Sequence, residues 1–180
     1  MRKNLKDIPW ITYRDGFDPI EGWVSDSGWG CMIRVAQMMV WNSLMRHLKS
    51  QLSDETRKKH QISNTELMRN VLPLFLDDYG KAEAPFSIRN IISKGKELLH
   101  KGAGEWYGAH SISQVIKAVN DSYNNQYYKN FRVLTFNEGI VYKDEVLSVF
   151  NVERTSGALV IVPMRLGMKK LDRLYFTQIK

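Results

Sequence analysis

Apolar residues recur most regularly in the segment that begins at Cys31, the single cysteine of the chain. From Cys31 to about Leu48 they return at spacings of three or four, which predicts one helix. The stripe consists of Ile33, Ala36, Val40, Leu44 and Leu48, and it is widened by Met32, Val35, Met38, Met39, Trp41 and Met45. The first turns are therefore apolar almost all round, and a helix of that kind is normally buried in a domain core.

Further periodic segments predict a domain of mixed helices and strands. Helical spacing is found over Thr65–Gly80, Pro85–Leu99, His110–Tyr123 and Asp144–Phe150, and a last helix is predicted to open over Leu171–Lys180. Within these segments Pro73 predicts a kink or break, Ser87 a helix cap and Gly95 a helix end. Two apolar runs, Phe131–Phe136 and Ala158–Gly167, predict strands. The continuous apolar start of the second run predicts a central strand covered on both faces.

The segments between these elements are polar or rich in turn formers. Trp10–Ile20 predicts a short extended piece with turns at Asp15-Gly16 and Asp18-Pro19. Candidate caps for the helix that follows are Ser25, Asp26 and Ser27. We expect the polar stretch Gln51–Asn64 to be a surface insertion and residues 1–9 to form a disordered tail.

Composition narrows the class of protein. A chain of 180 residues can build one domain with its own core, and 43% hydrophobic with 25% charged residues is ordinary for a globular protein. One cysteine excludes an internal disulfide, which fits a reducing, cytoplasmic location. No apolar run is long enough to form a transmembrane segment. No residue spacing indicates a metal or a cofactor, and we expect neither.

The charge balance of 26 − 19 = +7 does not predict nucleic-acid binding. Basic residues are scattered, and their densest cluster is Arg57–His60, so a solvated surface is favoured over a phosphate-binding patch. The aromatic and basic stretch Tyr123–Arg132 could stack on bases. It leads into an apolar run, however, and we interpret it as a connection between a helix and a strand.

Cys31 has the setting of a nucleophile. It is predicted to lie in the first turn of a helix, where unpaired backbone N–H groups carry partial positive charge and favour a thiolate. Gly28 and Gly30, on either side of Trp29, would let the backbone approach a substrate closely. The competing interpretation is a buried cysteine that acts only as a small hydrophobic residue.

A nucleophilic cysteine also needs a base, and no histidine stands at a diagnostic spacing. His47 would lie roughly 24 Å from Cys31 along the predicted helix. His60 and His100 are in charged stretches and are expected to be solvated, whereas His110 follows a glycine-rich aromatic loop and could approach a site.

Several motifs together resemble one protease family. TYRDGFDPI followed by SDSGWGCMIRVAQMM strongly resembles the autophagy-related protein 4 cysteine proteases, also called autophagins. APFSIRNII, GEWYGAHSISQVIKAV and IVPMRLG resemble further family segments in the same order. The resemblance runs from about Trp10 to the last residue, and the block around Cys31 is its most specific part.

The resemblance implies a fold, a reaction and a set of site residues. The fold would be a papain-like α/β (α+β) cysteine protease domain, of which residues 1–180 form a part. Cys31 would be the nucleophile, Tyr13 would help the oxyanion hole, and Trp106 would cover the substrate's glycine tail. The substrate-binding residues would also include Gly28, Trp29 and Gly30. The substrate would be a ubiquitin-like autophagy modifier, cut after its C-terminal glycine and removed from its phosphatidylethanolamine conjugate at membranes.

Two departures from the family pattern qualify these expectations. Ala109-His110 stands where the family has Pro-Ser, which would loosen the loop that carries Trp106. The chain also contains no Asp-x-His, so we expect a domain truncated before the C-terminal sheet strands and the Asp-Pro-His motif. We therefore expect little proteolytic activity from these 180 residues alone. The alternative is a catalytically inactive, truncated module that binds the modifier without cutting it.

Overall fold

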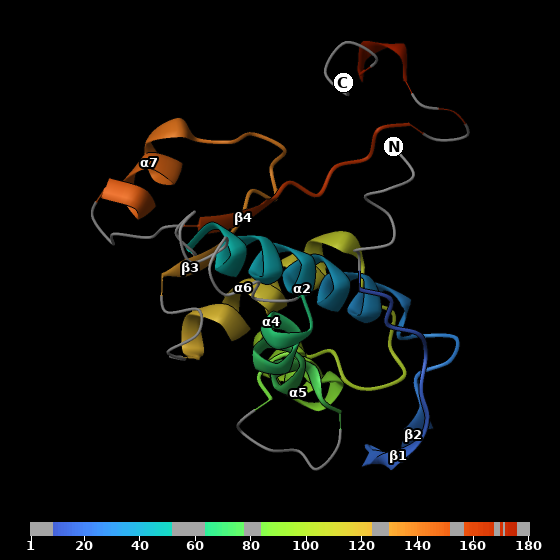
Figure 1. The fold of residues 1–180 in the computed structure, drawn as a ribbon. Helices are drawn as coiled ribbons and strands as arrows, with labels where there is room; N and C mark the ends of the chain where they lie inside the picture. The colour runs from blue at the N-terminus through green and yellow to red at the C-terminus, as the bar shows by residue number, and fades with distance from the viewer. Residues whose placement is uncertain are drawn as a thin grey trace.

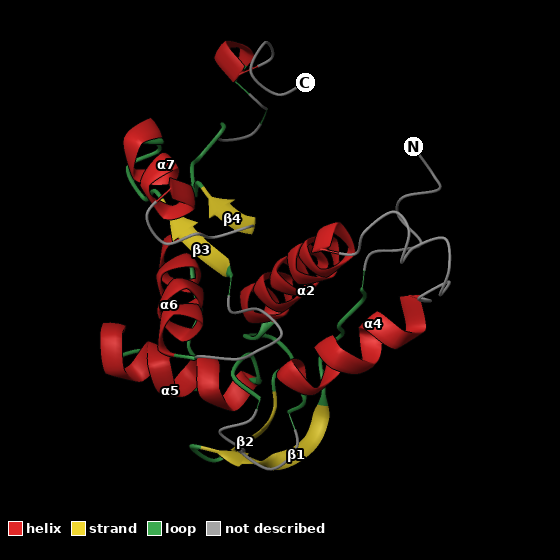
Figure 2. Cartoon of the chain, turned by 60° about the vertical axis from the view of Figure 1, so that its left-hand side comes forward, coloured by secondary structure: helices red, strands yellow, loops and turns green. Residues whose placement is uncertain are grey.

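The computed structural model describes residues 9–51, 64–77, 84–123, 130–151, 157–167, 170 and 172–175. It shows helices packed around one long central helix, with a small antiparallel hairpin and a small parallel sheet on its flanks (Figure 1, Figure 2). The elements are β1 Asp15–Ile20, β2 Trp23–Ser25, α2 Cys31–Gln51, α4 Asn64–Val71, η1 Leu72–Phe75, α5 Ile88–Leu99, α6 Ala109–Ser122, β3 Phe131–Thr135, α7 Lys143–Asn151, β4 Gly157–Ile161 and η3 Arg173–Tyr175. The mixture of helices and strands predicted from the sequence is confirmed.

Helix α2 is the centre of the structure. It begins at Cys31, as predicted, and it contacts α4, α6 and β4. Its predicted stripe is buried except at Leu48, which is partly buried. The expectation of an apolar helix buried almost all round is wrong at Val35 and Met39, which are 40% and 36% exposed. These residues are four apart and therefore share one exposed face of the helix, whereas the buried face also includes the polar Arg34 and Gln37.

The N-terminal strands form a hairpin, and its turn differs from the predicted ones. β1 pairs antiparallel with β2, and Ile20 faces Trp23 across a two-residue loop. Glu21 and Gly22 both have positive φ, 51° and 90°, as a type I′ hairpin turn requires. The predicted turns at Asp15-Gly16 and Asp18-Pro19 lie inside β1 instead. Gly16 has a φ of 75° where the strand register shifts, so the glycine serves an irregularity in the strand.

The helices after α2 differ from their predicted ends for identifiable reasons. The helix predicted over Thr65–Gly80 stops at Val71 and continues only as the 3₁₀ turn η1, because Pro73 lacks an N–H and clashes with the preceding turn. In α5 the Ser87 cap is confirmed, since its side chain accepts the N–H of Asn90. Gly95 does not end α5, which runs to Leu99 and is capped by His100 in the left-handed conformation.

The parallel sheet consists of β3 and β4, paired from Phe131↔Gly157 to Thr135↔Ile161. β3 packs on α6 and is largely buried. The prediction of a doubly covered central strand over Ala158–Gly167 is wrong. Its strand ends at Ile161, Val160 is 39% exposed, and β3 is its only partner within the described residues. Pro163, two residues after the end of the strand, has no N–H with which to continue the hydrogen-bond ladder.

Several other expectations fall near or outside the described residues. The predicted helix Asp144–Phe150 is confirmed as α7, which packs a second small core of Leu134, Phe136 and Val149. The helix predicted over Leu171–Lys180 is found only as η3. The tail of residues 1–8, most of the polar insertion (52–63) and the connection at 124–129 lie outside the described residues. None of the described helices combines the length and the apolar character needed to cross a bilayer.

Gly95 is held inside α5 by the ring of Tyr107. A Cβ built on Gly95 would overlap the hydroxyl of Tyr107 and come within 2.7–2.8 Å of its ring carbons. Tyr107 is fully buried, and its hydroxyl donates to the carbonyl oxygen of Lys101 at 2.6 Å, so the ring cannot move aside.

We expect Gly95→Ala to destabilise the fold although alanine is the better helix former. The gain of about 1 kcal/mol in helix propensity is outweighed by overlap in a closed core, which typically costs about 1–3 kcal/mol. Urea unfolding measures the difference. Ser93→Ala, at an exposed position of the same helix, is the control and should be neutral or slightly stabilising. A Gly95→Ala variant as stable as the control would contradict the proposed contact.

His47 lies at the opposite end of α2 from Cys31, where the helix meets the parallel sheet. Its side chain is 7% exposed, its ring lies 5.5 Å from that of Phe131, and a Cβ on Gly157 would come 2.5 Å from its Nδ1. Burial lowers the pKa of His47 below its usual value. The unfolded chain therefore binds the proton more tightly than the folded chain does.

The sign of this difference predicts a loss of stability on acidification. The free energy of unfolding should fall as the pH drops below about 6.5, the pKa of an unfolded histidine. The fall continues down to the lowered pKa of His47 in the folded chain. Urea unfolding at pH 7.5 and 5.5 tests this for the original chain and for His47→Gln, which keeps an uncharged polar side chain. Between pH 7.5 and pH 5.5 the original chain should lose more unfolding free energy than His47→Gln does. A difference between the two proteins that does not change with pH would contradict this prediction.

Candidate active site

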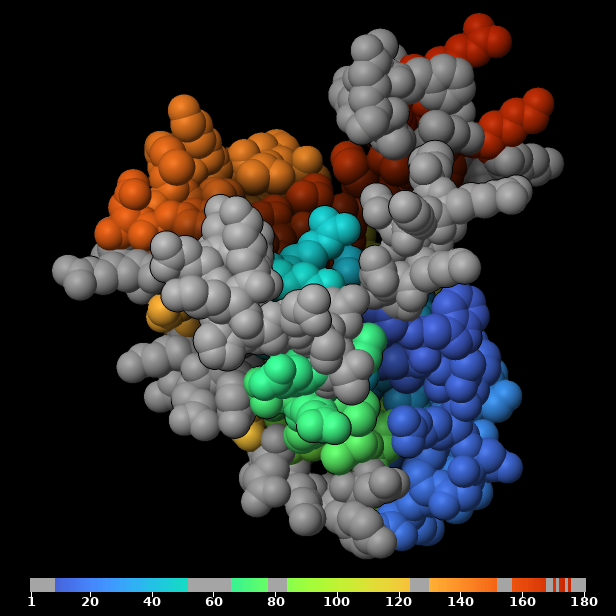
Figure 3. Space-filling model, viewed as in Figure 1, coloured from blue at the N-terminus to red at the C-terminus, as the bar shows by residue number. Residues whose placement is uncertain are grey.

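Cys31 lines a hollow at the start of α2. The hollow has a volume of about 360 Å³, and its walls are the segment before β1 and the first two turns of α2. The lining residues are Trp10, Ile11, Thr12, Tyr13, Cys31, Arg34, Val35 and Met38. The structure thus brings together Cys31 and Tyr13, two of the residues predicted to form the site. The chain from the hollow through the hairpin (blue) occupies the lower right of the surface in Figure 3.

The position of Cys31 suits the chemistry of a nucleophile. It is the first residue of a 21-residue helix and is partly exposed, so a reagent can reach its sulfur. Backbone N–H groups at a helix start lack intrahelical acceptors and carry partial positive charge. Such donors can stabilise an oxyanion that forms next to the thiol.

The loop before Cys31 owes its shape to Gly28, Trp29 and Gly30. Gly28 has a φ of 88°, which favours glycine, and a Cβ on Gly30 would lie 2.5 Å from Oδ2 of Asp26. The indole of Trp29 is 4% exposed, and its Nε1 donates to the carbonyl oxygen of Ser25 at 2.9 Å. All three residues have a structural role in the turn, and their predicted contact with substrate stays a prediction.

A buried ion-pair network lies beneath the hollow. Arg34, one turn after Cys31, is 3% exposed. Its Nε donates to Oδ2 of Asp26 at 2.7 Å and its NH1 to Oδ2 of Asp77 at 2.7 Å. NH1 also donates to Oε1 of Gln37 at 2.9 Å. Burial opposes the charged guanidinium, but the hydrogen bonds and charges of the two aspartates outweigh it and raise the pKa of Arg34.

The two aspartates extend this network to other segments. Oδ1 of Asp26 accepts the backbone N–H of Arg14 at 2.6 Å, and Oδ1 of Asp77 accepts that of Ile88 at 2.8 Å, at the start of α5. The sequence-based expectation that Asp26 caps α2 is wrong, because both of its carboxylate oxygens are already bonded to Arg14 and Arg34. Sequence reasoning missed this network, although Arg34 and Gln37 interrupt the apolar pattern of the helix and could have indicated it.

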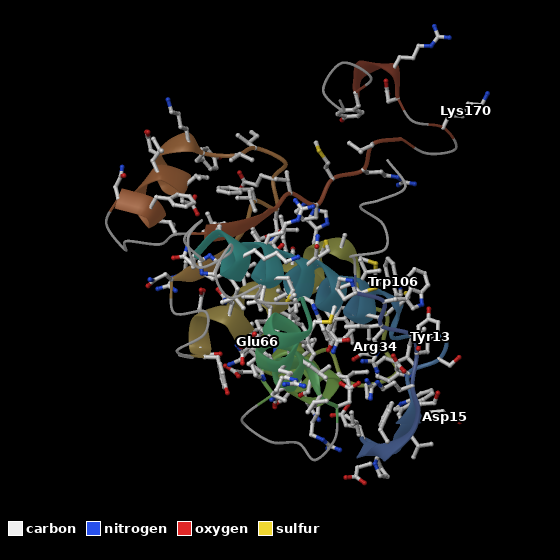
Figure 4. All side chains as sticks on the ribbon, viewed as in Figure 1. Tyr13, Asp15, Arg34, Glu66, Trp106 and Lys170 are labelled. Atoms are coloured by element: carbon white, nitrogen blue, oxygen red, sulfur yellow. The ribbon has the colours of Figure 1, made fainter. Side chains whose placement is uncertain are left out.

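Trp106 lies in the loop between α5 and α6 and is 64% exposed. In Figure 4 it and Tyr13 are drawn toward the end of α2 where the helix begins, and Trp106 is not among the residues that line the hollow. Its neighbour Tyr107 is buried, and burial together with the charges of Glu105 and Glu21 raises the pKa of Tyr107 to about 12.

The loop around Trp106 is held by contacts that do not involve Ala109-His110. Glu21 accepts the N–H of Ala103 at 2.8 Å, and a Cβ on Gly104 would come 2.5 Å from the indole of Trp23. Because these contacts join the loop to the hairpin, they offset the flexibility expected from the missing Pro-Ser.

None of the described histidines lines the hollow of Cys31. His47 is sixteen residues along α2, His100 caps α5 and is exposed as predicted, and Nε2 of His110 lies 3.2 Å from the carbonyl oxygen of Asn137. His60 lies outside the described residues. Within the described ranges no cluster of three or more His, Cys, Asp or Glu side chains could hold a metal ion.

Comparison with known proteins identifies relatives along the whole chain. A family model described as the peptidase C54 catalytic domain matches residues 1–180. The probable cysteine protease ATG4 of Chaetomium globosum is 31% identical, and the match covers 92% of this chain and 40% of that protein. The probable cysteine protease atg4 of Sclerotinia sclerotiorum is also 31% identical, over 95% of this chain and 43% of that protein. The cysteine protease ATG4 of Pyricularia oryzae is 29% identical, over 93% and 37%. The chain therefore spans about two fifths of the length of these curated relatives.

The network predicts a large loss of stability when Arg34 is removed. Arg34→Met keeps the length of the side chain but leaves the buried carboxylate of Asp26 without a charge partner. The buried carboxylate of Asp77 is left with only the half-exposed Arg14. Breaking a buried pair in this way typically costs about 3–5 kcal/mol. Chemical denaturation should show that loss as a lower free energy of unfolding.

The matched control is Arg89→Met. Among the described residues, Arg89 hydrogen-bonds to the main-chain oxygens of Asp18 and Pro19 in an exposed setting, and its loss should cost no more than about 0.5 kcal/mol. Equal losses in the two variants would show that the buried ion pairs contribute nothing specific.

Proposed function

The chain belongs to the peptidase C54 family, and from this premise we propose that Cys31 is the nucleophile of a cysteine protease that acts after the C-terminal glycine of a ubiquitin-like autophagy modifier. The observation that carries the proposal is the hollow that joins a partly exposed thiol at a helix start to the side chain of Tyr13. A papain-like architecture with the nucleophile at the head of its central helix is part of the proposal, and the position of Cys31 at the start of α2 supports it.

The proposed reaction is acyl transfer. The sulfur of Cys31 attacks the carbonyl carbon of the terminal glycine, and the carbonyl oxygen becomes an oxyanion. The hydroxyl of Tyr13 and the N–H groups at the start of α2 donate hydrogen bonds to that oxygen. The amine leaves with a proton, and water then releases the modifier from the thioester. The family resemblance assigns the proton transfer to an Asp-Pro-His motif that these 180 residues do not contain.

The same chemistry applies to the lipidated modifier. In a phosphatidylethanolamine conjugate the glycine carbonyl is joined to an ethanolamine nitrogen, so the bond to be cut is again an amide of the terminal glycine. Attack by Cys31 would form the same thioester in both cases. We therefore include removal of the lipid in the proposed function, together with a cytoplasmic location that reaches both substrates.

Trp106 and the glycine-rich loop support selectivity for a glycine tail. A large, exposed indole near the hollow can cover a main chain that carries no side chain, whereas any Cβ would enlarge the tail beneath it. The contacts of the loop with Glu21 and Trp23 hold its main chain while leaving the indole itself free at the surface.

One observation favours a second candidate function, that of a modifier-binding module without catalysis. No described histidine lines the hollow of Cys31, so the described residues supply a thiol but no imidazole beside it. The experiment must therefore separate attack by Cys31 from turnover of substrate.

A thioester of the modifier makes that separation. The modifier carrying a C-terminal glycine thioester should transfer its acyl group to Cys31, because a thiolate leaves without help from a general acid. Intact-mass measurement should show the acylated chain, formed at least tenfold faster than on a synthetic peptide of residues 25–39. Tyr13→Phe should slow acylation by about 10²-fold, the usual effect of removing one oxyanion donor. Cys31→Ala should give no adduct.

The matched control for Tyr13→Phe is Tyr142→Phe, because both tyrosines are about half exposed and Tyr142 is not among the residues that line the hollow. Its acylation rate should be unchanged. Binding of the modifier without acylation would favour the binding module, and acylation no faster than on the peptide would refute the proposed nucleophile.

A further inference from the structure

We propose that Asp26 is a positioning residue that holds Tyr13 against Cys31. The inference rests on the proposed function, because the position of Tyr13 relative to Cys31 matters only if Tyr13 stabilises the oxyanion that forms at Cys31. The carboxylate of Asp26 is buried and does not line the hollow. The inference follows from the two segments of chain to which this carboxylate is hydrogen-bonded.

On one side, Asp26 binds the main chain next to Tyr13. Its Oδ1 accepts the N–H of Arg14 at 2.6 Å, and its own N–H donates to the carbonyl oxygen of Arg14 at 3.2 Å. The hydroxyl of Ser25 donates to the same carbonyl at 3.2 Å. Both polar groups of the peptide backbone of Arg14 are thus bonded to Ser25 and Asp26, and Tyr13 is the preceding residue.

On the other side, Asp26 is joined to the helix that carries Cys31. Its carbonyl oxygen accepts the N–H of Gly30 at 2.8 Å, directly before the cysteine. Its Oδ2 accepts Nε of Arg34 at 2.7 Å. Arg34 lies one turn into α2 and is labelled in Figure 4. One fully buried residue therefore bonds both walls of the hollow, and Arg34 prevents its carboxylate from rotating away.

This link matters for catalysis because oxyanion stabilisation is sensitive to geometry. A displacement of about 1 Å in a reacting or stabilising group can cost about 10²-fold in rate. Tyr13 is 49% exposed, so packing on its side chain contributes little to its position. The main-chain bonds of the next residue to Asp26 set that position instead.

Asp77 offers a matched comparison within the same network. It too has no exposed side-chain surface and pairs with Arg34 at 2.7 Å. Its other oxygen, however, accepts the N–H of Ile88 at the start of α5 and not the chain beside Tyr13. Nε of Arg14 lies 3.3 Å from Asp77, but this contact involves the half-exposed side chain of Arg14 and not its main chain. Asp77 therefore does not fix the backbone next to Tyr13.

Asparagine substitutions test the difference. Each aspartate uses one oxygen for Arg34 and the other for a backbone N–H, whereas asparagine has a single acceptor oxygen. The charged guanidinium should keep that oxygen, since its hydrogen bond is the stronger one. In Asp26→Asn the N–H of Arg14 then faces an NH₂ group, and in Asp77→Asn the N–H of Ile88 does.

Two measurements are made on the full chain, each at a temperature where the variant is folded. The first is hydrogen exchange of the Arg14 amide. The second is the rate of acylation by the glycine thioester divided by the rate of alkylation by iodoacetamide, which needs the thiol but no oxyanion donor. We expect Asp26→Asn to lose protection at Arg14 and to lower the rate ratio at least tenfold. In Asp77→Asn, the protection of the Arg14 amide and the rate ratio should both stay within about twofold of their values in the original chain.

A double variant shows whether the effect acts through Tyr13. Adding Asp26→Asn to Tyr13→Phe should cause little further loss, because the hydroxyl to be positioned is already absent. Should Asp26→Asn fail to fold, Gly30→Ala replaces it. Its Cβ would lie 2.5 Å from Oδ2 of Asp26 and displace the carboxylate without removing a charge, so the same loss at Arg14 and in the rate ratio is expected.

The outcomes separate this inference from the proposed function. Equal effects of the two asparagine variants, or an Arg14 amide that stays protected in Asp26→Asn, would overturn the positioning role. An original chain that reacts with iodoacetamide but not with the thioester would refute the proposed function. In that case the exchange measurement still decides whether Asp26 holds the chain beside Tyr13, because it requires no substrate.

Discussion

The buried guanidinium of Arg34 is the constraint on which the rest of the structure depends. A charge with 3% of its side-chain surface exposed is stable only if opposite charges and hydrogen-bond acceptors surround it. Asp26 and Asp77 supply the charges from two separate segments, and Gln37 supplies a further acceptor from the same helix. Arg14 brings a second positive charge to Asp77, so these four charged residues sum to zero. The chain must therefore bring residues from before β1, from the loop before α2 and from beyond η1 to one point.

This convergence explains why the hollow lies where it does. The network fixes the start of α2 against the segment before β1, and the gap between those two pieces of chain is the hollow that Cys31 and Tyr13 line. Glycine at position 30 follows from the same cause, because any Cβ there would occupy the space of the Asp26 carboxylate. The glycines beside the cysteine are thus required by the polar core beneath them, whatever further purpose they serve toward a substrate.

The sequence predicted those features that local periodicity determines and failed where distant residues decide. The start of α2 at Cys31, the Ser87 cap and the helices α6 and α7 follow from spacing alone, and they were confirmed to within about one residue. The expectation that Gly95 ends α5 was wrong, because this glycine lies inside the helix in contact with Tyr107, twelve residues away. Asp26 was one of three candidate helix caps, because its partners Arg14 and Arg34 cannot be recognised from a local sequence pattern. In the same way, an apolar run could not reveal that β4 has a single described partner.

The proposed site also shows how exposed side chains can be held in place. Three of the residues proposed for the site, Tyr13, Trp106 and Cys31, lie within two positions of a residue that is fixed in the interior or by the main chain. Tyr13 precedes Arg14, whose backbone is bonded to Asp26. Trp106 precedes Tyr107, which is fully buried. Cys31 lies two residues before Ile33, also fully buried on α2. Because the neighbouring residue sets the position of the main chain, the functional side chain can remain open to a substrate without becoming mobile, and a site built this way needs no packing around its reactive groups.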